Sequence, residues 1–183
     1  MKQKILACLL LLVLAVAATG CASSGGTAAQ SDAKLTSFTA TTLDGGTFTE
    51  ADIAAKDLTV VNFWMTSCRP CINEMPDLAA FEKRLPDNVQ LITACIYGEE
   101  DLQEVQGVMD ASGFEGVTLV AGDGDYEALM NSVQATPTTV FVGSDGALVG
   151  DVIVGTQPDL EGTLLDAINA VLEDEGKAAI TLD

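Results

Sequence analysis

Histidine is absent from the chain, and basic residues are scarce. The 183 residues include no His, and 8 Lys and Arg face 27 Asp and Glu, for a net charge of −19. Without His there is no Ser-His-Asp or Cys-His catalytic pair, no His-containing zinc site and no His-ligated haem. The charge argues against nucleic acid as a partner, because neutralising phosphates requires clustered Lys and Arg. Chemistry in this chain is therefore expected to use sulfur or carboxylate groups.

A hydrophobic run long enough for a permanent membrane span is also missing. The apolar run Ile5–Ala18 has 14 residues, and a spanning helix needs roughly 20. The run follows Lys2 and Lys4 and ends in Thr19-Gly20-Cys21. A basic start, a short apolar run and a small-residue exit are the parts of a secretory signal peptide. We therefore expect residues 1–20 to be a signal peptide.

The end of this run, Ala18-Thr19-Gly20-Cys21, resembles a bacterial lipobox, in which the cysteine is lipidated and becomes the first mature residue. Ala18 departs from that pattern, which usually has Leu at this position. The alternative is an ordinary signal peptide cut near Ala-x-Ala. Residues 21–34 are mostly small and polar, which predicts a flexible tether. The lipobox resemblance implies a protein anchored by lipid at Cys21, on the extracytoplasmic side of a bacterial membrane.

The five cysteines have different expected fates. Cys8 lies in the signal peptide and Cys21 would carry the lipid, which leaves Cys68, Cys71 and Cys95. An odd number of thiols in an exported protein leaves at least one unpaired or partnered elsewhere. Cys95 lies in an apolar run and is expected to be buried and inert. The mature chain would hold six basic and 27 acidic residues, a net charge of −21.

Residues 35–183 form one expected domain in which strands and helices alternate. This order predicts an α/β fold with a mixed central sheet flanked by helices. The Gly143-Ser144-Asp145-Gly146 turn predicts a β-hairpin. The expected strands are 58–64, 89–97, 117–120, 138–142 and 148–154, the expected helices are 67–84, 101–112, 126–133 and 160–173, and an antiparallel hairpin is expected within 35–50.

A Cys-x-x-Cys motif, Cys68-Arg69-Pro70-Cys71, stands between an expected strand and an expected helix that Ser67 would cap. The free amides and dipole of a helix N-terminus stabilise a thiolate, so the Cys68 pKa should fall from ~8.5 toward ~7. Cys68 is therefore the expected attacking sulfur. Cys71 lies one turn deeper and can resolve a mixed disulfide. Arg69 would favour the thiolate further, and Pro70 would stiffen the turn.

A metal site, a haem site and a structural disulfide each fit the two cysteines less well. A structural zinc site needs four ligands, and only three mature thiols and no His are present. A c-type haem site needs His after the second cysteine, where this chain has Ile72. A purely structural disulfide across two residues gains little chain entropy. A redox-active disulfide, with no metal and no other cofactor, is the favoured interpretation.

The chain resembles the thioredoxin superfamily and, within it, the TlpA/ResA-like extracytoplasmic thiol–disulfide oxidoreductases. The resemblance spans about residues 38–173, and its specificity comes from the combination of motifs. Those motifs are Val60-Val61-Asn62-Phe63-Trp64-Met65-Thr66-Ser67-Cys68-Arg69-Pro70-Cys71, Glu74-Met75-Pro76 and Ala135-Thr136-Pro137-Thr138-Thr139. It implies a thioredoxin-like fold with the early hairpin as an N-terminal extension. Ser67 departs from the family, where Trp commonly precedes the first cysteine.

The resemblance also implies roles for individual residues. Pro137 matches the family's cis-proline, which lies across from the cysteine pair and offers backbone hydrogen bonds to a client. Glu74 matches an acidic residue that tunes the thiols or shuttles a proton; a solvated surface carboxylate is the alternative. Asn62 replaces the buried Asp of ordinary thioredoxins. Trp64 is expected in the core or at the floor of the site, and the expected client-contacting set is Trp64, Arg69, Pro70, Thr136 and Pro137.

Three functions from different classes follow. The first is a membrane-anchored thiol–disulfide oxidoreductase. The resemblance favours a reductant of protein clients, such as the haem-accepting thiols of apocytochromes, recharged by a membrane electron-donor protein. The second is a thiol peroxidase, although the signature Pro-x-x-x-Thr/Ser-x-x-Cys is absent because Val61 and Met65 stand at its first two positions. The third is a non-catalytic lipoprotein that binds a partner on a thioredoxin scaffold.

Overall fold

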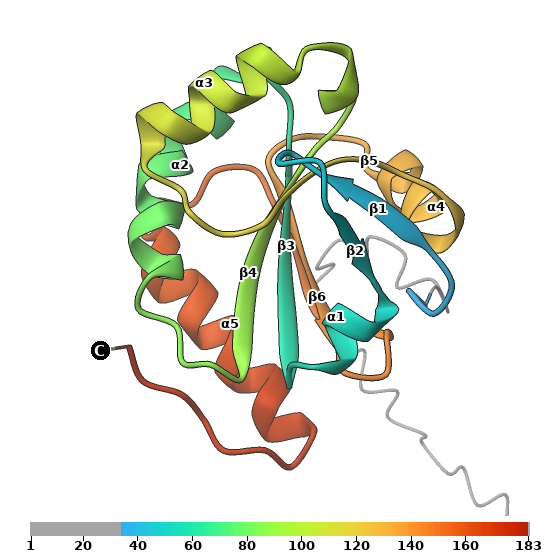
Figure 1. Cartoon of the computed structure of the whole chain (residues 1–183). Coiled ribbons are helices and arrows are strands. Elements are labelled where there is room, and N and C mark those ends of the chain that lie inside the picture. The colour runs from blue at the N-terminus through green and yellow to red at the C-terminus, as the bar shows by residue number, and fades with distance from the viewer. Residues whose placement is uncertain (1–33, 183) are drawn as a thin grey trace, which may run out of the picture.

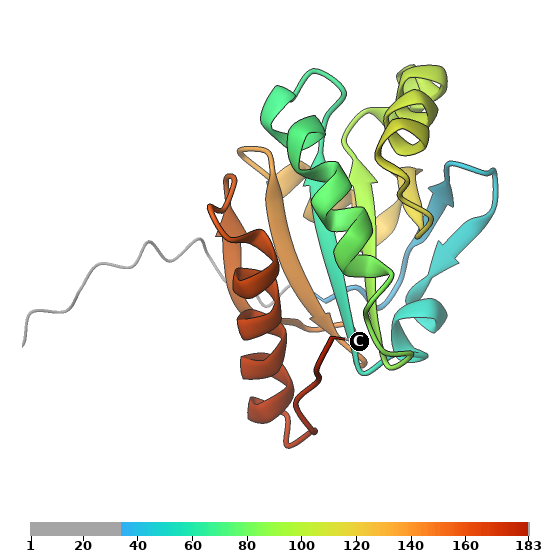
Figure 2. The ribbon, with the colours of Figure 1, turned by 90° about the vertical axis from the view of Figure 1, so that its left-hand side faces the viewer.

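A seven-stranded mixed sheet with helices on both faces forms the body of the protein (Figures 1 and 2). The computed structural model describes residues 34–182. The strands are β1 (Thr39–Thr42), β2 (Thr47–Thr49), β3 (Leu58–Trp64), β4 (Val89–Cys95), β5 (Thr118–Gly122), β6 (Thr138–Gly143) and β7 (Leu148–Val154). The helices are α1 (Glu50–Ala54), α2 (Arg69–Glu82), the short 3-10 helix η1 (Gly98–Glu100), α3 (Leu102–Ser112), α4 (Gly124–Ser132) and α5 (Leu160–Asp174). The expected α/β fold is confirmed.

The sheet separates two apolar layers, and β3 contributes to both. All seven residues of β3 are buried. Val60 and Trp64 pack in the layer beneath α2, α3 and α5, whereas Val61 and Phe63 pack in the layer toward α1 and α4. This alternation is what the period of two in a β-strand requires. β3 is therefore the central strand around which both layers are built.

The N-terminal hairpin joins the main sheet instead of standing apart from it. β1 pairs antiparallel with β2 on one side and with β5 on the other. The Asp125 carboxylate accepts hydrogen bonds from the backbone N–H groups of Thr36 and Ser37, at 2.9 and 2.8 Å. These bonds lower the pKa of Asp125. The acidic residue in the first turn of α4 thus holds the start of the folded chain in place.

Most expected elements lie within a few residues of their observed bounds, and the exceptions are short. The single turn α1 and η1 were not predicted. Thr49 caps α1 through a reciprocal pair of hydrogen bonds with Asp52. This capping stabilises a helix that is too short to be recognised from hydrophobic periodicity. α2 ends at Glu82 rather than near residue 84, and it continues through Pro76. α3 begins after the cap Asp101 and ends at Gly113, which has a φ of 70°.

The pairing of β3 brings two distant segments to one end of the sheet. β3 runs parallel to β4 and antiparallel to β6, and Phe63 is paired with Thr138. The residues that follow β3 therefore lie beside the residues that precede β6. That end of the sheet is where the Cys-x-x-Cys motif and the Thr136–Pro137 segment come together.

The packing of α5 on the sheet should govern stability. Ile168 has no exposed surface and lies in the larger apolar layer, so Ile168→Ala should lower the free energy of unfolding by about 3 kcal/mol. The measurement is urea denaturation followed by circular dichroism. Leu102→Ala is the control, because Leu102 is 47% exposed and its loss should change stability by less than about 0.5 kcal/mol. Equal effects of the two substitutions would contradict this assignment of the core.

Candidate redox site

The turn between β3 and α2 places Cys68 at the helix N-terminus. Cys68, not Ser67, is the N-cap of α2, and the backbone N–H of Cys71 donates to Cys68 Sγ at 3.3 Å. Ser67 is exposed and does not cap the helix, which corrects the sequence prediction. Pro70 occupies the first turn, where its missing N–H leaves no helix hydrogen bond unmade. One helix amide thus points at the first sulfur of the motif.

The two cysteines of the motif form a disulfide and differ in exposure. Cys68 and Cys71 are bonded, with their Cα atoms 5.3 Å apart. Cys68 is half-buried, whereas Cys71 has no exposed surface. A thiol partner in solution can therefore reach Cys68 but not Cys71. This difference agrees with the expected order of attack, in which Cys68 reacts first.

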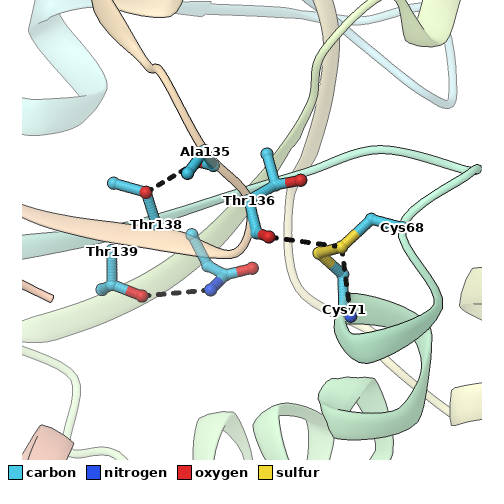
Figure 3. The surroundings of a disulfide bond; sticks show 7 residues. Cys68, Cys71, Ala135, Thr136, Thr138 and Thr139 are labelled. Carbon is cyan, nitrogen blue, oxygen red and sulfur yellow. Dashed lines mark hydrogen bonds between the residues drawn. A yellow bond between two sulfur atoms is a disulfide. The ribbon is translucent and has the colours of Figure 1, made fainter. Parts of the chain in front are cut away.

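The segment before β6 lies directly against this disulfide, as Figure 3 shows. The Thr136–Pro137 peptide bond is cis, as expected for Pro137. The carbonyl oxygen of Thr136 is 3.6 Å from Cys68 Sγ. Oxidised Cys68 has no proton, so this is a close approach of the sulfur to the carbonyl oxygen. Thr138 Oγ1 donates to the Ala135 carbonyl at 2.8 Å and fixes the loop.

Beneath the disulfide lies a buried polar group. Glu74, on α2 one turn after Cys71, is only 8% exposed, so the alternative of a solvated surface carboxylate is wrong. Burial raises the pKa of Glu74 to about 7; a hydrogen bond from Asn62 opposes the rise, and the charge of Asp77 adds to it. A carboxyl with this pKa exchanges a proton near neutral pH.

Asn62 links Glu74 to the strand beside β3. Its side-chain Nδ2 donates to Thr139 Oγ1 at 3.0 Å, and the two residues are cross-strand partners in the β3–β6 pairing. Asn62 Oδ1 is buried without a hydrogen-bond partner among the described residues. The role of Thr139 could not be inferred from the sequence, because it depends on the register between two strands that are far apart in the chain.

Trp64 and Cys95 lie under the site, side by side on β3 and β4. Trp64 has no exposed surface, so its indole lies in the core and is not available to a client, which corrects its place in the client-contacting set. Cys95 is a free, buried thiol, as expected. Burial raises the pKa of Cys95 to about 12. A thiol with that pKa is almost fully protonated at neutral pH and is a poor nucleophile.

The rest of the expected client-contacting set gathers around Cys68. Arg69 and Pro70 are exposed next to it, and Thr136 is half-buried opposite, whereas Pro137 is buried. The expected role of Pro137 involves its backbone, and burial of the ring does not exclude that. Within residues 34–182, no three Cys, Asp or Glu side chains gather as a metal site would need. No helix in that part of the chain is long and apolar enough to cross a membrane.

A disulfide at the N-terminus of the helix after the central strand, faced by a cis-proline loop, defines the thiol–disulfide oxidoreductases of the thioredoxin superfamily. The sequence profile of the AhpC/TSA family matches residues 32–150, well over half of the chain. The chain therefore belongs to the AhpC/TSA family.

Known proteins agree with this class. The thioredoxin-like protein YneN of Bacillus subtilis is 28% identical over 128 residues, which cover 68% of this chain and 71% of YneN. A putative thioredoxin from Neisseria meningitidis is similar in structure, with a TM-score of 0.62, 25% identity, and coverage of 78% of this chain and 93% of that protein. A thiol:disulfide interchange protein from Chlorobium tepidum has a TM-score of 0.59 at 24% identity and covers 77% of this chain and 99% of its own. At that identity the second structure supports the fold alone.

The raised pKa of Glu74 predicts a pH-dependent stability. Glu74 binds its proton more tightly in the folded state than in the unfolded state, where its pKa is about 4.5. The tighter proton binding by Glu74 therefore adds fully to the free energy of unfolding below pH 4.5, and this contribution is lost as the pH rises to about 7. Relative to Glu74→Gln, the wild type should lose on the order of 2 kcal/mol of unfolding free energy across this interval.

The measurement is urea denaturation of both oxidised proteins at several pH values. Glu127→Gln is the control, because Glu127 is exposed on α4, and its pH profile should follow that of the wild type. If the profiles of Glu74→Gln and wild type run parallel from acid to neutral pH, the carboxyl of Glu74 does not titrate as its burial requires.

Proposed function

We propose that the chain is a lipid-anchored extracytoplasmic oxidoreductase that reduces disulfides of client proteins through Cys68 and Cys71. One observation carries the proposal: the half-buried Cys68 Sγ lies at a helix N-cap and 3.6 Å from the carbonyl of Thr136, next to a cis-proline. A reactive sulfur and the half-buried backbone of Thr136 thus lie next to each other at one end of the sheet.

The thiols act in two steps in this proposal. In the reduced protein, the Cys68 thiolate, stabilised by the Cys71 amide, attacks a client disulfide and forms a mixed disulfide, and the client's leaving sulfur takes a proton. Cys71 then gives its proton to the Glu74 carboxylate and attacks Cys68 Sγ. The mixed disulfide breaks, the client gains its second thiol, and the Cys68–Cys71 disulfide re-forms. Two electrons pass to the client, and a dithiol protein must return them.

The environment of Cys71 supports the direction of transfer. An oxidant such as DsbA gains its high potential because its reduced form is strongly stabilised. Here the carboxyl of Glu74 lies on the same buried face of α2 as Cys71, and above its pKa of about 7 its negative charge opposes a thiolate at that position. Destabilising the reduced thiolate lowers the reduction potential, which favours a reductant. The class of client, such as the haem-accepting thiols of apocytochromes, is proposed from the family resemblance.

The location of the protein is proposed from its N-terminal sequence. The signal peptide, the lipidation site Cys21 and most of the tether lie outside the described residues. The backbone of Leu35 donates to the Gly146 carbonyl at 2.8 Å, which supports a folded domain from residue 35. The 13 residues 22–34, between Cys21 and the folded domain, would let the domain reach on the order of 20 Å from the membrane. A membrane electron-donor protein would then recharge the disulfide.

A thiol peroxidase is the second candidate function, because the AhpC/TSA profile matches the chain. The peroxidase signature is absent around Cys68, where Val61 and Met65 replace its Pro and Thr or Ser. Rapid consumption of hydrogen peroxide by the reduced protein would favour the peroxidase. A disulfide that exchanges with no thiol would favour the non-catalytic lipoprotein.

The two cysteines should have separable roles. Cys68→Ser should abolish reduction of a protein disulfide such as that of insulin, whereas Cys71→Ser should accumulate a mixed disulfide with the client because no resolving thiol remains. Mass spectrometry of the trapped species and turbidity measurements test this. Cys95→Ala is the control and should keep the wild-type rate.

The reduction potential of the Cys68–Cys71 pair should lie below about −200 mV, and a value near −120 mV would indicate an oxidant instead.

A lipid anchor at Cys21 predicts that replacing this cysteine changes the location of the protein in the cell. Cys21→Ser should prevent lipid attachment, so the protein should move from the membrane fraction to the soluble exported fraction of expressing bacteria. Cys8→Ser is the matched control and should leave the distribution unchanged. Mass spectrometry of the purified membrane form should find the lipid on Cys21. A Cys21→Ser protein that remains bound to membranes would contradict the lipid anchor.

A further inference from the structure

An apolar cleft that does not include the disulfide lies between α2 and α3. The two helices are neighbours in both views of the molecule (Figures 1 and 2). Its volume is about 350 Å³. Ile72 and Pro76 of α2 form one wall, Gly107, Val108 and Ala111 of α3 form the other, and Glu104 is the one charged residue among those that line it. Pro76, Gly107 and Ala111 are exposed, so no part of residues 34–182 covers the cleft.

The cleft begins about one helical turn from the reactive cysteine. Ile72 and Pro76 are four residues apart in α2 and share one helix face, and Ile72 is the fourth residue after Cys68, the N-cap of that helix. The backbone N–H of Ile72 donates to the Cys68 carbonyl at 3.1 Å. A partner whose sulfur is bonded to Cys68 would thus have the cleft about one helical turn away.

Exposed apolar and acidic side chains lead into α3 from the same end of the sheet. The described residues include three exposed large hydrophobic side chains, and two of them, Tyr97 and Leu102, flank η1. Tyr97 has a φ of 59°. Glu99 and Glu100 of η1 are exposed beside them, and Glu104 follows in the first turn of α3. We name Glu99, Glu100 and Glu104 the acidic rim.

The acidic rim is not neutralised by the protein's own cations. Among the described residues, the ion pairs form at Asp57, Asp145, Glu115, Glu161 and Glu175, and none forms at the rim. An apolar cleft with Glu104 in its lining, and with Glu99 and Glu100 in the short helix just before α3, is complementary to a partner segment that carries Lys or Arg beside apolar side chains. A second copy of this chain is a poor occupant because its net charge is also strongly negative.

We propose that the α2–α3 cleft and its acidic rim are the docking site for a cationic, apolar segment of the protein that exchanges thiols with Cys68. The proposal rests on the proposed function for the identity of the partner, but docking itself requires no electron transfer. Apolar side chains of the partner fill the cleft beside Ile72 and Val108 while its Lys or Arg side chains face the rim. The site thereby selects partners by charge before chemistry begins.

Binding of a short fluorescent peptide of Lys, Leu and Ser to the oxidised full-length protein tests the proposal. The peptide contains no cysteine, so fluorescence anisotropy measures docking alone. Wild type should bind it with a Kd in the micromolar to millimolar range, and the matched peptide with Glu in place of Lys should bind at least tenfold more weakly. A Ser-for-Leu peptide that keeps its lysines should also bind several-fold more weakly, because it cannot fill the cleft.

Two variants locate the binding site. A Cβ at Gly107 meets nothing within 4 Å, so Gly107→Leu fills the cleft while raising helix propensity; it should weaken binding at least fivefold, whereas Gly107→Ala should bind nearly as the wild type does. The triple substitution Glu99→Gln, Glu100→Gln and Glu104→Gln should weaken binding at least fivefold at low salt and much less at high salt. Glu127→Gln, Asp166→Asn and Glu173→Gln together are its control, because they remove the same charge from α4 and α5.

The outcomes separate docking from redox function. Unchanged Kd values in both Gly107→Leu and the rim variant, equal losses in the rim variant and its control, or no binding by wild type would overturn the docking site. Dimerisation of the wild type in place of peptide binding, measured by light scattering, would assign the cleft to a second copy and overturn it as well. Failure to reduce insulin would contradict the proposed function but would leave these Kd values, and therefore the docking site, unaffected.

Discussion

The antiparallel pairing of β3 with β6 is the constraint on which the site depends. Because Phe63 is paired with Thr138, the turn after β3 and the loop before β6 meet at one end of the sheet. Cys68 and the Thr136 carbonyl come from these two segments and lie 3.6 Å apart, although 68 residues separate them. A slip of one residue in this register would turn every β3 side chain to the opposite face and separate the sulfur from the loop.

The same pairing places polar groups inside the apolar layers. Asn62 lies directly across from Thr139, and the hydrogen bond between them satisfies one side of a fully buried amide. The other neighbour of Asn62 is Glu74, whose burial next to Cys71 on α2 keeps its pKa near neutrality. Burying a polar group costs free energy unless the group is hydrogen-bonded. Asn62 and Glu74 are therefore retained at this end of the sheet for the chemistry of the site and not for stability.

Some of the excess acidic residues have a structural role. Asp101 and Asp159 each cap a helix by accepting from a backbone N–H, and a carboxylate there also interacts favourably with the helix dipole. Asp125 holds the start of the folded chain. Other carboxylates, such as Glu99 and Glu100, have no such task in the fold. They lie at the end of the sheet that carries the disulfide, which is why their charge bears on partners instead of stability.

The sequence by itself determined the class of fold and the cysteine pair, because strand and helix periodicity and the spacing of Cys68 and Cys71 are local properties, whereas the proline opposite the pair was implied by the resemblance to the thioredoxin superfamily. The same resemblance pointed to Glu74, but not to the burial of its carboxyl group. Only the tertiary structure decided that Cys68 caps the helix in place of Ser67, that Trp64 lies beneath the site, and that Asn62 is bonded to Thr139. Each of these depends on which side of a strand or helix meets another element, and that is set by sheet register and packing between residues far apart in the chain.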